Sequence, residues 1–159
     1  MLSKKIETAL NKQIVMEAYA SFYYLAAASW CDKQGLFGCS KFMYSHAEEE
    51  RDHMMRLFNY IIDAGGNAIA PAVKQPPKEF GTLKKMFKNV LEHEVEVTGS
   101  INNLVDLCIK EKDHSTNNFL QWFVAEQHEE EKVFSTIIDR MNIIGDEEKN
   151  LSCIDQELS

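Results

Sequence analysis

Two residues that could bind a metal ion stand one helical turn apart near the first third of the chain. Glu50 and His53 form an E-x-x-H pattern, which on a helix places a carboxylate and an imidazole on the same face. Such oxygen and nitrogen donors suit iron or manganese, and zinc can compete for them. The pattern occurs by chance in many helices, so its meaning depends on what the fold places beside it.

Three further segments offer carboxylates within otherwise apolar helical patterns. They are Glu17, Glu94 and the segment from Glu126 to Glu130, in which Gln127 and Glu130 have the spacing of a helical turn. Burying unpaired carboxylates costs several kcal/mol for each group, and no lysine or arginine stands on the same faces. Bound cations would compensate this cost. Two adjacent metals that share a bridging carboxylate would suit chemistry on O₂.

The elements that must position these residues are long helices. The chain has only 7 Gly and 3 Pro in 159 residues, about half of average usage, and they lie at a few joints. Between the joints, apolar residues recur at the three- and four-residue intervals typical of bundle helices. We expect helices over 5–34, 39–64, 82–111 and 116–144, and a short helix within 146–159.

One joint is much longer than the others. The segment from Gly66 to Phe80 contains all three prolines, and fully extended it could run the whole length of a neighbouring helix. The other joints are short and favour antiparallel neighbours. The sequence therefore predicts an all-α fold with a single domain over 1–159, a four-helix bundle with one long crossover and a short C-terminal fifth helix.

The carboxylates lie at similar distances from the starts of their helices. Each is about 10 to 14 residues along, a rise of about 15 to 21 Å, so antiparallel packing brings all four segments to one level. For the helix 116–144 we expect two apolar rows: Phe119, Phe123, Glu126, Glu130, Val133 and Ile137, beside Leu120, Val124, Gln127, Glu131, Phe134 and Ile138. His46 is interpreted as a core histidine without a nearby partner, and His128 as a surface residue.

The sequence resembles the haem-free bacterial ferritins over essentially its whole length. The residues that carry the resemblance are Glu17 with Tyr24, HAEEERDH at 46–53, the crossover 71–80, His93-Glu94 and NFLQWFVAEQHEEEK at 118–132. The resemblance implies a hollow shell of 24 identical subunits. Each subunit would hold a ferroxidase centre that oxidises Fe(II) with O₂ or H₂O₂, and Fe(III) would be stored as a mineral inside.

The resemblance also implies roles for individual residues, with two or three irons in each subunit. The residues that match the ligands of the iron pair are Glu17, Glu50 and His53 for the first iron, with Glu50 bridging, and Glu94 and Glu130 for the second, with Gln127 close by. The residues that match a third iron site beside the pair are Glu49, Glu126, Glu129 and Glu130. Tyr24 and Trp122 match aromatic residues that could donate electrons, and core filling is the alternative for both.

Haem is not expected. Haem-binding bacterioferritins carry a methionine directly after the glutamate of the first E-x-x-H, and this chain has Arg51 there. Two other functions stay open. One is a non-catalytic helical shell or interaction protein whose glutamates bind structural cations. The other is a peroxide-detoxifying protein like the miniferritins, although those place their ligands at a subunit interface and lack the last short helix.

Charge and composition limit the partners. The chain has 17 Lys and Arg against 25 Asp and Glu, a net charge of −8, which disfavours nucleic acid or an anionic membrane as the main partner. The four cysteines include no C-x-x-C pair, which favours reduced thiols in an intracellular protein. The N-terminal residues lack a secretory signal, so we expect a cytoplasmic protein.

Overall fold

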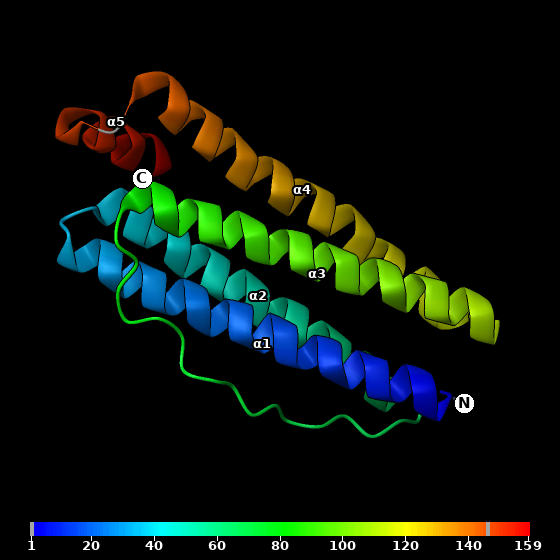
Figure 1. The fold of residues 1–159 in the computed structure, drawn as a ribbon. Coiled ribbons are helices and arrows are strands. Elements are labelled where there is room, and N and C mark those ends of the chain that lie inside the picture. Colours follow the sequence, from blue (N-terminus) through cyan, green and yellow to red (C-terminus); the bar gives the residue numbers. More distant parts are fainter. Residues whose placement is uncertain (1, 146) are drawn as a thin grey trace.

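The computed structural model describes residues 2–145 and 147–159, which form five helices and no strand. The helices are α1 (Lys4–Lys33), α2 (Phe37–Asp63), α3 (Leu83–Glu111), α4 (His114–Ile144) and α5 (Glu148–Leu158). The first four form a bundle, and α5 lies at one end of it (Figure 1). The predicted all-α bundle with a short C-terminal helix is confirmed. Helices α2 and α4 each begin two residues earlier than expected. Asp146, at the start of the last predicted segment, lies outside the described residues.

The segment between α2 and α3 runs along the whole bundle. It leaves α2 at the end where the N-terminus lies and joins α3 at the opposite end (Figure 1). The side chain of Asn11 in α1 holds this segment, because its Nδ2 donates to the Asn67 carbonyl at 3.0 Å and its Oδ1 accepts from the Ile69 amide at 2.8 Å. Because this segment crosses from one end of the bundle to the other, α2 and α3 run in the same direction. The pairs α1 with α2 and α3 with α4 are antiparallel.

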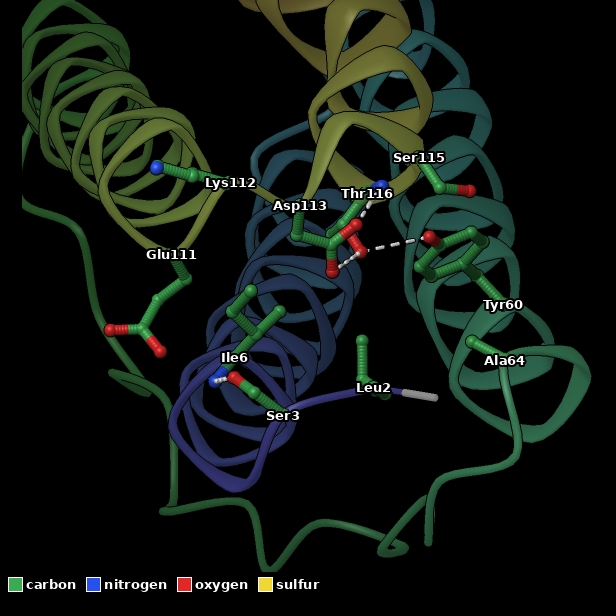
Figure 2. Close-up of a pocket in the computed structure, with 10 residues that line it drawn as sticks. All are labelled: Leu2, Ser3, Ile6, Tyr60, Ala64, Glu111, Lys112, Asp113, Ser115 and Thr116. Carbon is green, nitrogen blue, oxygen red and sulfur yellow. Dashed lines mark hydrogen bonds between the residues drawn. The ribbon is translucent and has the colours of Figure 1, made fainter.

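The turn between α3 and α4 lies at the end of the bundle where the N-terminal residues lie, and hydrogen bonds fix it there. Asp113 caps α4, since its carboxylate accepts from the Thr116 amide at 2.9 Å and from the Thr116 hydroxyl at 2.6 Å (Figure 2). Because the hydroxyl proton of Thr116 goes to Asp113, the Tyr60 hydroxyl is the donor in its 2.9 Å bond to Thr116. These bonds satisfy the first amides of α4 and connect the turn to α2.

The apolar core is divided into two clusters by buried polar residues. On α1, Ile14 belongs to one cluster and Ala20 to the other, and the fully buried Glu17 lies between them. The same separation holds on the other three bundle helices. The buried polar residues between the clusters are Glu50 and His53 on α2, Glu94 on α3, and Gln127 and Glu130 on α4. The expectation that the carboxylates share one level is confirmed.

The buried face of α4 differs from the two predicted rows. The buried residues of α4 are Thr116, Leu120, Phe123, Gln127, Glu130, Phe134, Ile137, Ile138 and Met141, a single row that takes members from both. Glu126 is only half-buried. Phe119 was expected in the buried face because it is large and apolar. It lies instead at the flank of the helix, where its ring stacks on Tyr60 with centroids 3.8 Å apart.

None of the helices in the described part of the chain combines the length and the apolar character needed to cross a membrane. The four cysteines are free thiols, as the sequence indicates. Cys31, Cys39 and Cys108 are buried in the bundle and Cys153 is exposed on α5.

The contact between α2 and α5 leads to a test with two glycines. A Cβ atom added to Gly38 would lie 1.8 Å from the carbonyl oxygen of Asp155 in α5, whereas a Cβ on Gly99 in α3 would meet nothing within 4 Å. We predict that Gly38→Ala displaces α5 and speeds amide hydrogen exchange over residues 148–158. Gly99→Ala should leave this exchange unchanged and raise the melting temperature, because Ala is favoured over Gly inside a helix by about 1 kcal/mol. Unchanged exchange in Gly38→Ala would contradict the packing of α5.

Candidate metal centre

The middle of the bundle holds six buried side chains with metal-binding or hydrogen-bonding groups. No member is more than 5% exposed. The members of this central cluster are Glu17, Glu50, His53, Glu94, Gln127 and Glu130. All four bundle helices contribute, so the cluster exists only when all of them are packed.

Three residues of the central cluster offer one complete set of donors for a cation. One ligand atom from each of Glu17, Glu50 and His53 lies within 4.8 Å of the other two, and the Nδ1 of His53 is 3.3 Å from the Oε2 of Glu50. Glu17 Oε2, Glu50 Oε1 and His53 Nδ1 are buried without a hydrogen-bond partner. A buried polar atom left in this way costs about 1–3 kcal/mol, and a cation among the three would supply the missing partner.

Glu94 is held from two sides. Its Oε1 accepts a hydrogen bond from the Tyr24 hydroxyl, and its Oε2 accepts from the Nε2 of Gln127 at 3.0 Å. Burial, followed by the charge of Glu94, raises the pKa of Tyr24 well above its ordinary value, so this phenol keeps its proton. Glu94 therefore has a fixed orientation, with Tyr24 directly beside the cluster.

Glu130 completes the cluster from α4 and is less constrained. Its Oε2 is buried and has no hydrogen-bond partner. Burial, followed by the charge of Glu94, raises its pKa to about 8. Glu130 is thus a buried acid with an oxygen free to bind a cation.

The electrostatics of the cluster favour added positive charge. Burial raises the pKa of Glu17 and of Glu50 well above the ordinary value, and the next contribution is repulsion from Glu50 and from Glu94, respectively. Among the described residues, no ion pair of a lysine or arginine reaches the cluster. Within the described residues, no lysine or arginine offsets these acids through an ion pair.

A buried glutamine that the sequence interpretation missed orients one of the carboxylates. Gln13 is fully buried one helical turn before Glu17, and its Nε2 donates to Glu17 Oε1 at 2.8 Å. Its own Oε1 accepts from the Ser100 hydroxyl of α3 at 2.5 Å. The i,i+4 spacing of Gln13 and Glu17 on one buried face was the available signal.

The interpretation of His46 is partly wrong. The side chain is buried, as expected of a core histidine, but it does have nearby partners. Its Nε2 lies 3.7 Å from Glu130 Oε2 and 3.9 Å from Glu49 Oε2. The spacing of His46 and Glu49, three residues apart on α2, was the signal that could have identified this group.

The residues that match a third iron site are less enclosed than the central cluster. Glu49 and Glu129 are exposed and Glu126 is half-buried, whereas Glu130 is shared with the central cluster. Trp122 is half-buried beside the cluster, 5.3 Å from the His53 ring between centroids, and the Arg56 guanidinium lies 4.0 Å above its ring. His128 is exposed, as expected.

The pocket at the end of the bundle is separate from this centre. It lies between the N-terminal residues, the end of α2 and the α3–α4 turn (Figure 2). None of its lining residues belongs to the central cluster. The candidate metal centre is therefore distinct from this end pocket. A different pocket, between α3 and α4, includes Gln127 of the central cluster among its lining residues.

Comparison with known proteins agrees with this architecture. The family profile "Ferritin-like domain" matches residues 7–144. A probable bacterial non-heme ferritin-like protein of Haemophilus influenzae is 45% identical over 99% of this chain and 96% of its own, and a bacterial non-heme ferritin of Campylobacter jejuni is 43% identical over 98% and 93%.

A solved structure gives the same result. The open-pore ferritin of Archaeoglobus fulgidus superposes with a TM-score of 0.97 at 41% identity and covers 99% of this chain and 98% of its own. With four helices that place buried carboxylates and a histidine at one level, and with this similarity over the full length, the chain belongs to the ferritin family.

Proposed function

We propose that this protein stores iron and has ferroxidase activity, and that Fe(II) is its substrate. The observation that carries the proposal is the set of buried, unpartnered ligand atoms on Glu17, Glu50, His53 and Glu130. No lysine or arginine in the described part of the chain forms an ion pair with them. In the proposed arrangement, Glu17, Glu50 and His53 bind one iron, Glu94 and Glu130 bind a second, and Glu50 bridges them. Gln127 orients Glu94.

The proposed reaction uses O₂ or H₂O₂ as oxidant. Each Fe(II) gives up one electron, so a pair of irons reduces O₂ to H₂O₂, or H₂O₂ to water, and hydrolysis of Fe(III) releases protons. The buried carboxylates offset the charge of two adjacent cations and prefer hard ions such as Fe(III). The two apolar clusters lie on either side of the central cluster and restrict the access of water to it. The exclusion of water strengthens the electrostatic interactions at the site.

The proposal includes a homo-oligomeric shell of 24 subunits, in the cytoplasm and without haem. Exposed apolar side chains on α1 support association between subunits. Val15, Phe22 and Leu25 are each more than two-fifths exposed, and such surfaces mark interfaces. Arg51, in place of a methionine, supports the absence of haem.

Removal of a bridging ligand tests the activity. We predict that Glu50→Ala lowers the rate of aerobic Fe(II) oxidation at least tenfold. Even residues that only hydrogen-bond to a metal ligand contribute about 10–100-fold to metal affinity or activity. The measurement is O₂ consumption after addition of Fe(II) to the metal-free protein, together with particle mass.

The matched control is Glu48→Ala, which removes an exposed glutamate two residues away on the same helix and should leave the rate unchanged. Equal rates in both variants would favour a non-catalytic shell protein with structural cations. A dodecameric particle would favour a peroxide-detoxifying function over storage.

The buried acids predict how pH acts on the metal-free protein. Glu130 has a pKa of about 8 in the folded chain against an ordinary value of 4.5, so the folded state binds more protons between these values. The free energy of unfolding must then fall as pH rises. His93 acts in the opposite sense below about pH 6.5, because burial lowers its pKa. We therefore expect the melting temperature to fall between about pH 6.5 and pH 8.

Two comparisons test whether the buried acids cause this fall in melting temperature. Glu130→Gln should have a shallower pH dependence over the same range, because its amide does not titrate. Zn²⁺ added to the metal-free protein should restore stability at pH 8 by binding to the folded state. A melting temperature that is constant or higher at pH 8 in the metal-free protein would contradict the burial of unpaired acids.

Gln13 provides a test of how Glu17 is positioned. Gln13→Leu keeps the buried volume similar but removes the hydrogen bond to Glu17, so we predict a loss of about 10–100-fold in Zn²⁺ affinity, measured by calorimetry on the metal-free protein. Gln121→Leu, at an exposed position of α4, is the control. Unchanged affinity in Gln13→Leu would mean that Glu17 does not depend on this bond.

A further inference from the structure

Three sulfur-bearing side chains from three helices lie in the apolar cluster at the α5 end of the bundle. They are Cys31 near the end of α1, Cys39 in the first turn of α2 and Met86 in the first turn of α3, and all three are fully buried. The Sγ of Cys31 is 3.8 Å from the Sδ of Met86. Cys39 lies close enough to Cys31 for their charges to interact. We call these three residues the sulfur cluster.

The distance between two of the sulfur atoms suits ligands of one metal ion. With metal–sulfur bonds of about 2.3 Å, two sulfur ligands at trigonal or tetrahedral angles lie about 3.8–4.0 Å apart. Cys31 and Met86 already have this separation, so a shared ion would not require α1 and α3 to move. Thiolate and thioether sulfur are both soft donors that select soft metal ions.

A carboxylate of α5 lies beside both thiols. Burial raises the pKa of Cys31 and of Cys39, and the charge of Asp155 acts on each in the same direction. The Oδ1 of Asp155 accepts a hydrogen bond from the Cys39 amide at 2.8 Å. The thiols therefore keep their protons and are poor nucleophiles. An ion that binds sulfur strongly would displace these protons, and the half-buried Asp155 offers them a path to solvent.

A surface pocket leads toward the sulfur cluster. The pocket has a volume of about 540 Å³, and Trp30, Leu36 and Leu83 are among the residues that line it. Each of these three precedes one member of the sulfur cluster by one or three positions in the chain. The same three helices that carry the sulfur atoms thus form part of the pocket wall, which gives an ion a route from solvent to within about one helical turn of the cluster.

We propose that Cys31, Cys39 and Met86 form a binding site for the soft monovalent ion Cu(I), with two thiolate ligands and one thioether ligand. The thioether favours Cu(I) over Zn²⁺, whose protein ligands are thiolates, imidazoles and carboxylates. Binding of one Cu(I) releases two thiol protons to solvent, and copper stays in the same oxidation state, so the step needs no oxidant or reductant. The site goes beyond the proposed storage of iron, because the central cluster offers mainly oxygen donors, which prefer harder ions.

The test is an anaerobic titration of the metal-free protein with Cu(I) in competition with a chromophoric Cu(I) chelator. We expect one Cu(I) in each chain, with sulfur neighbours at about 2.3 Å in the X-ray absorption spectrum. Cys39→Ser, and Met86→Leu at similar core volume, should each lower the affinity at least tenfold, because each removes a ligand. The controls Cys108→Ser and Cys153→Ser remove one buried and one exposed thiol outside the sulfur cluster and should leave the affinity unchanged.

Three results would overturn the copper site. They are an unchanged affinity in Met86→Leu, a spectrum with oxygen or nitrogen neighbours in place of sulfur, and complete removal of Cu(I) from the unmodified protein by the chelator. An increase in the melting temperature of the unmodified protein on addition of Cu(I), absent in Met86→Leu, would support it, since the ion binds the folded state. Fe(II) oxidation by Met86→Leu should match that of the unmodified protein, because the sulfur cluster and the central cluster share no residue. Failure of one proposal therefore leaves the other standing.

Discussion

The arrangement of this bundle depends on one constraint: acidic side chains from four helices are buried together, and no lysine or arginine among the described residues pairs with them. Glu17, Glu50 and Glu130 each have a raised pKa caused first by burial. A core of this size could have been filled with apolar residues at lower cost. Instead the apolar residues form two separate clusters, and the stability of those clusters must offset a destabilised middle layer.

The backbone topology follows from the same constraint. Each helix has to extend beyond the acidic layer in both directions, so that apolar packing exists on both sides of it, and this explains helices of 27 to 31 residues in the bundle. The crossover then sets the direction of α3. In each antiparallel pair, the two helices cross the acidic layer in opposite directions. Glu17 on α1 and Glu94 on α3 therefore lie at the same level as the ligands on α2 and α4.

Much of this could be predicted from sequence because helical periodicity is strong in long, uninterrupted segments. On α3, apolar residues recur at the three- and four-residue intervals from which the helix was predicted, and Leu83, Phe87, Val90, Val97, Ile101, Leu104 and Cys108 are all buried. On α4, the apolar residues Phe119 and Val133 favoured two offset rows, whereas the buried face takes members from both. The stacking of Phe119 on Tyr60, which sequence does not reveal, places Phe119 at the flank. Gln13 and His46 were missed for a different reason. Each has one partner on its own helix, Glu17 and Glu49 respectively, at a spacing that is common on any helix. The second partner, Ser100 for Gln13 and Glu130 for His46, lies on another helix and is brought near only by tertiary packing.

The absence of a second histidine in the cluster gives α4 a distinct chemical character. An imidazole offers one lone pair once its other nitrogen is protonated, and so it binds one metal. A carboxylate has two oxygens and can bridge two cations or exchange between them. With Glu130 at this position, α4 gives the central cluster a carboxylate with a buried, unpartnered oxygen where a repeated pattern would give an imidazole. The departure from a repeated E-x-x-H pattern therefore gives α4 a ligand that can serve more than one cation.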